Sequence, residues 1–192
     1  LNINGRYHGS VTPGLPPTKF ANGYQYQFEL VISKEILIGD LTDFELLVNE
    51  TNTILKTTGN GGGVVSNGFD IRFELADGTK LNHCTLKYDG TTGKFIGIVK
   101  IPTVYYKKNT YIYMYIGKTL AATEEDRVSA LSNWYSFWYP PTVTDYTNNG
   151  YDLQLLGTTA LDSTPDWGQA LDFQGQSLGQ AICPNFTPLN NA

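Results

Sequence analysis

Residues 67–79 read NGFDIRFELADGT, and this stretch decides the fold. Apolar residues occupy every second position from 69 to 75, and charged residues fill the positions between them. This alternation predicts a strand with one buried face and one solvated face. The dipeptide Asp77-Gly78 ends the strand, because it tolerates positive φ in a tight hairpin. On the outer face, the order acid, base, acid allows Arg72 to pair with Asp70 or with Glu74.

The composition predicts an all-β protein. The chain has 192 residues, enough for one large domain with a smaller attachment. Hydrophobic residues make up 41%, which excludes a disordered chain, and the 13 Tyr, 20 Gly and 9 Pro are typical of strands joined by many turns. The net charge of −5 argues against a nucleic-acid partner. No apolar run is long enough for membrane insertion.

Several other segments have strand patterns. The loop at 51–63 ends in a glycine-rich run without the Lys-Ser/Thr of a phosphate-binding loop, so we expect it to be flexible. The expected strands are 24–32, 44–48, 81–88, 95–101 (closed by Pro102) and 111–116. Together they predict an antiparallel β-sandwich, jelly-roll or concanavalin-like, over residues 24–118. Its expected core is Phe28, Leu30, Phe44, Leu46, Phe69, Ile71, Phe73, Val99 and Ile101.

A short helix and an aromatic segment follow, over residues 119–139. Thr123 is a candidate N-cap with acidic residues after it, so a helix is expected near 123–135. An apolar stripe at helical spacing supports it: Val128, Leu131, Tyr135 and Trp138. The aromatic run 134–139 stops at Pro140-Pro141, and we interpret it as a hinge.

The two ends of the chain are expected to be extended arms. Residues 1–23 are rich in Gly and Pro, and the tail 176–192 offers Ile182, Phe186 and Leu189 as apolar contacts. Ordering such segments costs conformational entropy that buried surface must offset. We therefore expect the arms to contact other subunits, as in a homo-oligomer. The alternative is that they fold back on their own sandwich.

The cysteines and histidines indicate no metal or catalytic centre. Cys84 and Cys183 fit no zinc spacing, and they are either two free thiols or one long-range disulfide. His8 and His83 have no partners for a metal site or a triad, so both are expected on the surface or in turns. Neither lies in a nucleophile-elbow context, and no pair of carboxylates suggests glycoside hydrolysis. We expect the protein not to be an enzyme, and to have no cofactor.

Two groups of residues are candidates for binding. Asp145, Asn149 and Asp152 have the oxygen-rich spacing with which a calcium loop begins, but the closing acid is missing and Asx turns explain the stretch more simply. Aromatic residues form the second group. They are candidates for contact with a glycan or a partner, although tyrosines also serve as half-buried strand residues. The aromatic candidates are Tyr111, Tyr113, Tyr115, Trp134, Trp138 and Trp167.

Four segments of residues 24–118 resemble a numbered domain family of unknown function that occurs in secreted, surface and phage proteins. They are GDLTDFELLV at 39–48, DIRF with DGT at 70–79, IVKIP at 98–102 and IYMYIGK at 112–118. The sequence departs from the family pattern at Glu45, at 83–88 and at Lys118. The resemblance implies an extracellular, cell-surface or virion location.

Residues 140–192 resemble the opening of a laminin-G-like, concanavalin-type sandwich. The similarity lies in residues 145–156 and in QALDFQG at 169–175. A complete sandwich of this type needs more residues than this segment has. The second unit is therefore truncated, or completes the first sandwich, or is completed by a neighbouring subunit.

These observations lead to two expected functions. The first is a non-enzymatic structural or interaction subunit of an extracellular or virion assembly, such as a capsid decoration protein, spike, fibre or surface filament. The alternative is a carbohydrate-binding, lectin-like module, which the laminin-G-like resemblance implies.

Overall fold

The computed structural model describes Phe20 and residues 22–120, 122–140, 142–157, 159–164, 168–172 and 180–185. The chain divides into two compact units, Leu1–Ala130 and Leu131–Ala192, and each is described by itself. Most of the expected N-terminal arm and the end of the tail, including Phe186 and Leu189, lie outside the described residues.

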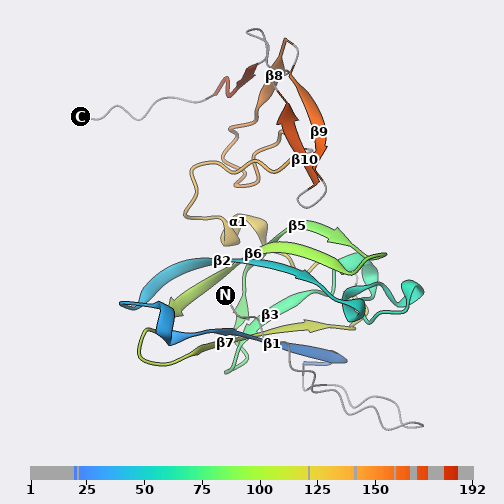
Figure 1. Cartoon of the computed structure of the whole chain (residues 1–192), viewed down its shortest axis with the longest axis vertical. Coiled ribbons are helices and arrows are strands. Elements are labelled where there is room, and N and C mark those ends of the chain that lie inside the picture. The colour runs from blue at the N-terminus through green and yellow to red at the C-terminus, as the bar shows by residue number, and fades with distance from the viewer. Residues whose placement is uncertain are drawn as a thin grey trace. The chain divides into compact units, whose positions relative to one another are not determined.

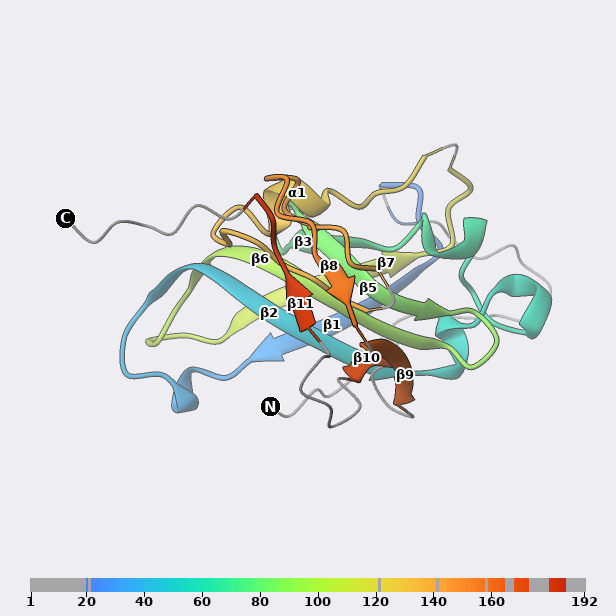
Figure 2. The same ribbon diagram turned by 90° about the horizontal axis from the view of Figure 1, so that it is seen from above.

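The first unit is a sandwich of two antiparallel sheets, as the sequence predicted (Figures 1 and 2). One sheet has the order β1-β7-β3-β4, and the other has the order β2-β6-β5. The strands of the first sheet are β1 (Tyr26–Ile32), β7 (Thr110–Ile116), β3 (Arg72–Leu75) and β4 (Lys80–Leu81). Those of the second are β2 (Leu41–Thr51), β6 (Lys94–Val104) and β5 (His83–Asp89). The 3₁₀ turns are Lys34–Ile36, Thr53–Leu55, Thr58–Asn60 and Ser66–Gly68.

The core between the sheets contains most of the predicted residues. Phe44 is only half-buried at its edge, and Phe69 was wrongly placed inside, because 48% of it is exposed. The strand begins at Arg72 rather than at 69, since Asn67 (φ 54°) and Gly68 (φ 90°) turn the chain just before it. The confirmed core residues are Phe28, Leu30, Leu46, Ile71, Phe73, Val99 and Ile101.

The predicted return strand at 81–88 is divided between the two sheets. β4 pairs with β3 after the hairpin at Asp77-Gly78, whereas β5 pairs with β6 of the opposite sheet. The change of sheet takes place at Asn82, whose carbonyl accepts a hydrogen bond from the Lys100 amide at 2.9 Å. Residues 80–89 therefore connect the two layers directly.

Strand β6 does not stop at Pro102, contrary to the prediction, but continues to Val104. Proline has no amide hydrogen to donate to the ladder. The pairing of β2 with β6 passes from Thr42–Thr103 to Phe44–Ile101, so Pro102 and the opposite Asp43, whose φ is 50°, do not pair. The register is the same on both sides of this point, so the ladder continues past the proline and lacks only the Asp43–Pro102 pair.

The glycine-rich loop is tied down rather than free, so the expectation of a flexible loop is wrong. Gly63 donates its amide to the Ile54 carbonyl at 2.7 Å, and Val64 donates to Lys56 at 3.0 Å. Leu55 and Val64 are buried in the core. These apolar anchors hold both ends of the loop.

The helix α1 covers only Arg127–Ala130, so it is shorter than predicted. The Asp126 carboxylate accepts the Ser129 amide at 3.0 Å, the bond that an N-cap residue makes. Thr123 was wrongly taken as the cap, because its hydroxyl accepts the Glu125 amide in a separate turn. In Figure 1 α1 lies beside β5 and β6 of the sandwich, and it packs on both.

The second unit contains two antiparallel ribbons of two strands each in its described part. One ribbon pairs β8 (Gln154–Leu156) with β11 (Gln180–Ile182), and the other pairs β9 (Ala160–Thr164) with β10 (Gly168–Asp172). Cys183 of this unit and the buried Cys84 of the first are both free thiols. Among the described residues, no helix is long and apolar enough to cross a membrane.

The neighbouring phenylalanines Phe73 and Phe69 provide a matched test of the strand boundary. Phe73→Ala should lower the free energy of unfolding by about 3–5 kcal/mol, because the ring is fully buried. Phe69→Ala should cost less than about 1 kcal/mol. Urea unfolding followed by fluorescence measures both, and equal costs would contradict the boundary at Arg72.

Candidate functional site

The outer face of sheet β1-β7-β3-β4 carries an unusual set of side chains. Along β7, Ile112 and Met114 point into the core, so the alternating Tyr111, Tyr113 and Tyr115 lie on the opposite face. The register places residues of β1 and β3 beside these tyrosines. The side chains that share the face are Gln27, Glu29, Arg72 and Glu74.

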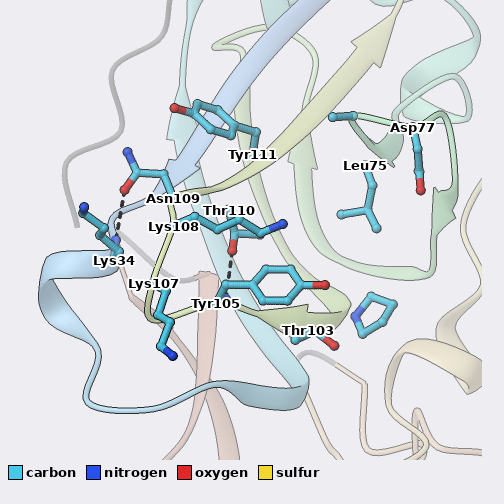
Figure 3. A pocket seen from close by; sticks show the side chains of 12 residues that line it. Lys34, Leu75, Asp77, Thr103, Tyr105, Lys107, Lys108, Asn109, Thr110 and Tyr111 are labelled. Atoms are coloured by element: carbon cyan, nitrogen blue, oxygen red, sulfur yellow. Dashed lines mark hydrogen bonds between the residues drawn. The ribbon is translucent and has the colours of Figure 1, made fainter.

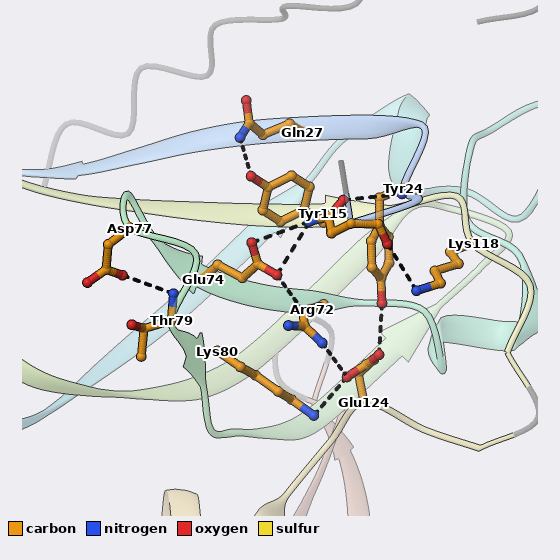
Figure 4. Close-up of polar contacts among 11 residues, drawn as sticks. Tyr24, Gln27, Arg72, Glu74, Asp77, Thr79, Lys80, Tyr115, Lys118 and Glu124 are labelled. Atoms are coloured by element: carbon orange, nitrogen blue, oxygen red, sulfur yellow. Dashed lines mark hydrogen bonds and ion pairs between the residues drawn. The ribbon is translucent and has the colours of Figure 1, made fainter. Parts of the chain in front are cut away.

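A groove of about 620 Å³ lies on this face. One side is formed by the β3–β4 hairpin with Asp77 and Gly78, and Phe20 contributes an aromatic side chain. The remaining lining mixes aromatic and polar groups, the combination that ligand sites use. It includes Gln27, Arg72, Glu74, Tyr113 and Tyr115, several of which are drawn in Figure 4.

The three tyrosines differ in accessibility. Tyr111 is 41% exposed, Tyr113 is half-buried, and Tyr115 is only 8% exposed. The Tyr115 hydroxyl accepts a hydrogen bond from Gln27 Nε2 at 2.6 Å, and its ring meets Phe20 edge-on at 5.6 Å. Burial raises the pKa of both Tyr113 and Tyr115. Tyr111 and Tyr113 can thus offer ring faces to a ligand, whereas the predicted contact Tyr115 serves as a packed wall.

Arg72 is the centre of a charged network beneath the groove (Figure 4). Its Nε lies 2.6 Å from Glu74 Oε1, and its Nη1 lies 3.2 Å from Glu124 Oε2. Lys80 Nζ lies 2.7 Å from the same Glu124 oxygen, and the Tyr24 hydroxyl donates to Glu124 Oε1 at 3.0 Å. The sequence predicted pairing with Glu74 or Asp70, and the structure shows Glu74. Glu124 lies 52 residues from Arg72 in the sequence, and no local pattern predicts this pairing.

The two carboxylates of this network are held rather than poised for catalysis. Both Glu74 oxygens accept from Asn22 Nδ2, at 3.3 and 3.4 Å. Burial raises the pKa of Glu124, but hydrogen bonds from Lys80 and Tyr24, with the charges of Lys80 and Arg72, outweigh it and lower the pKa overall. A general acid for glycoside hydrolysis needs the opposite shift. Glu124 is therefore suited to structure and charge balance.

Asp70 fastens the start of β3 to the end of β7, although the sequence placed it on the solvated face. It is fully buried, and its Oδ2 accepts the Gly117 amide at 2.7 Å and the Val65 amide at 3.1 Å. Gly117 has a φ of 92°, a conformation that glycine adopts without strain. Burial raises the pKa of the Asp70 carboxyl despite these bonds.

His83 is buried, so the prediction of a surface or turn position is wrong for it; His8 lies outside the described residues. Its ring packs edge-on against Phe73 at 5.2 Å. Burial, helped by the charge of Lys80, lowers its pKa to about 4. The apolar position at the start of β5 explains this neutral state.

The calcium candidates form an Asx-type anchor in the second unit. The buried Asp145 carboxylate accepts the amides of Phe137 and Thr147, both at 3.0 Å, and the Thr147 hydroxyl at 2.8 Å. Asp152 accepts the Asp145 amide at 2.8 Å, and the Asn149 side chain donates to the Tyr135 carbonyl. Within the described ranges no three acidic, His or Cys side chains gather as metal ligands do.

The two described tryptophan candidates make different contacts. Trp134 is exposed and meets Phe137 edge-on at 5.3 Å, while Trp138 donates its Nε1–H to the Tyr151 carbonyl at 2.7 Å. Trp167 lies outside the described residues. The structure adds a pair that the sequence did not suggest: Tyr135 and Tyr151 stack at 4.6 Å.

Comparison with known families gives a match over the middle of the chain. Residues 67–137 match a family model described as "Domain of unknown function (DUF2341)". No curated protein and no solved structure matches the chain. The match supports the resemblance to a numbered family of unknown function, and it spans β3 to α1 with the charges of Arg72, Lys80 and Glu124. Strands β1 and β2 precede it, and the likeness at 39–48 and the laminin-G-like segment stay predictions.

The Arg72 network yields a test of stability. Arg72→Met should lower the free energy of unfolding by about 3–5 kcal/mol, because it leaves the largely buried Glu74 carboxylate without its cation and leaves Glu124 with Lys80 alone. Arg127→Met, at an arginine that pairs with Glu125 and is far more exposed, should cost about 0–1 kcal/mol. Urea unfolding compares the two. The network would be contradicted by a small loss of stability in Arg72→Met that stays the same when Glu124→Gln is added.

His83 yields a pH dependence. Its pKa is about 4 in the folded protein and near 6.5 when unfolded, so the unfolded chain binds the proton first as pH falls. The free energy of unfolding should therefore drop by about 2 kcal/mol between about pH 6.5 and about pH 5.

His83→Leu should flatten this part of the pH profile, because it removes the buried imidazole. Unfolding midpoints measured across the range provide the check. An unchanged slope in His83→Leu would show that other groups titrate there.

Proposed function

We propose that this protein is a non-catalytic module that binds carbohydrate on the outer face of sheet β1-β7-β3-β4. The observation that carries the proposal is the pair Tyr111 and Tyr113, which present accessible rings on one face of β7 beside the groove. Residues two apart on a strand are about 7 Å from each other, so an extended ligand can touch both rings. The resemblance to secreted and surface proteins supports an extracellular, cell-surface or virion location.

The chemistry of the face suits a sugar chain. Aromatic rings offer apolar area with a polar rim, and the C–H faces of sugar rings can pack on them. Carboxylate and amide groups such as those of Glu74 and Gln27 can hydrogen-bond sugar hydroxyls. Because Arg72 and Asn22 already fix Glu74, binding orders few additional side chains.

Titration calorimetry with neutral and acidic oligosaccharides tests the proposal. Tyr111→Ala and Tyr113→Ala should each weaken binding by about 1–2 kcal/mol, roughly five- to thirtyfold, because each removes aromatic area from the ligand. Tyr106→Ala is the matched control, since Tyr106 is 38% exposed and lies outside the groove. Equal loss in all three variants, or no binding of any oligosaccharide, would refute the proposal.

A second candidate function is a structural subunit of an extracellular or virion assembly, such as a capsid decoration protein. The described part of the second unit favours it, because two-stranded ribbons are marginally stable alone and gain from a neighbouring partner. Light scattering should then give a mass above that of one 21.3 kDa chain. A strict monomer at all concentrations would remove this candidate.

A further inference from the structure

A second hollow of about 660 Å³ lies at the end of the sandwich where β6 turns into β7 (Figure 3). Its walls carry Tyr105 and Tyr111, and Lys34, Lys107 and Lys108 line it as well. Three cations gather here on a protein whose net charge is −5. The hollow is thus a local basic site on an acidic molecule.

The three lysines are available for a ligand. The ion pairs within the described part of the chain involve other cations, and all three lysines are exposed. Lys108 Nζ lies 4.2 Å from the centre of the Tyr105 ring, which holds the ammonium at the wall of the hollow (Figure 3). The amide of Lys34 is fixed by Asn109 Oδ1 at 3.1 Å, so the turn and the Lys34 backbone are joined.

The hollow and the groove share one wall. Both are lined by Leu75, Ala76 and Asp77 of the β3–β4 hairpin. Tyr111 belongs to the hollow and Tyr113 to the groove, and these residues are two apart on β7. A ligand that stacks on both rings therefore reaches the lysines.

Asp77 is the one carboxylate that lines the hollow, among the residues described. Hydrogen bonds from Thr79 lower its pKa, so it stays charged at neutral pH. It sits on the hairpin, whereas the lysines come from the β6–β7 turn and from Lys34. Asp77 repels an acid group of a ligand, so such a group is directed to the lysine side of the hollow. Sugar hydroxyls can donate hydrogen bonds to Asp77.

We infer that the ligand is an anionic glycan, whose carboxylate or sulfate groups bind Lys34, Lys107 and Lys108 while its rings pack on Tyr111 and Tyr113. This inference rests on the proposed carbohydrate binding and specifies its ligand class. The alternative is that Lys107 and Lys108 only solvate the β6–β7 turn. In that case the charge of the glycan has no effect on its affinity.

Calorimetry on the full chain with three probes tests the inference: an oligogalacturonate, a heparin-derived oligosaccharide and neutral cellohexaose. The double variant Lys107→Gln/Lys108→Gln should weaken binding of an acidic probe about tenfold, with about threefold per exposed ion pair, and leave cellohexaose unchanged. Raising salt from about 50 mM to about 300 mM should weaken the acidic probe alone. Lys94→Gln, at the opposite end of β6, is the matched control and should change neither.

The outcomes separate this inference from the proposed function. If the double lysine variant weakens binding of only one acidic probe, that probe identifies the preferred acid group as carboxylate or sulfate, and the inference is supported. Equal affinity for neutral and acidic probes, still sensitive to Tyr113→Ala, overturns the anionic preference but leaves carbohydrate binding intact. No binding of any probe overturns both.

Discussion

The guanidinium of Arg72, placed between the carboxylates of Glu74 and Glu124, is the interaction on which the candidate site depends. It joins β3 to Glu124, 52 residues further along the chain, and Lys80 adds β4 to the same carboxylate. Removing these charges from water is costly, and they are stable only as a complete set. The set in turn fixes Glu74 under the groove and positions the Tyr24 hydroxyl before β1.

The sequence predicted the sandwich because its strands alternate cleanly between apolar and polar residues. The prediction failed just before β3, where the alternating pattern begins earlier than the strand itself. Phe69 and Asp70 keep the period of β3, yet positive φ at Asn67 and Gly68 reverses the chain, exposing one and burying the other. Alternation also cannot show that a strand changes sheets, as residues 80–89 do at Asn82.

The candidate site was only partly visible in the sequence for a related reason. The tyrosines of β7 were found because they lie two apart on one strand. Their partners Gln27, Arg72 and Phe20 come from distant segments, and only the register of the sheet brings them to the same face. That register also decides that Tyr115 becomes a packed residue. A binding surface built on the face of a sheet is rigid, because each side chain is anchored to a paired backbone.

The interruption of the β2–β6 ladder at Asp43 has a consequence for the behaviour of the protein at high concentration. β2 is an edge strand of eleven residues, and a straight edge of this length offers a row of backbone donors and acceptors to any other extended chain. The left-handed residue breaks that row near its start and points a carboxylate outward, 3.6 Å from Lys100 Nζ. The unpaired position opposite Pro102 thus interrupts the edge that amyloid-like growth would otherwise extend.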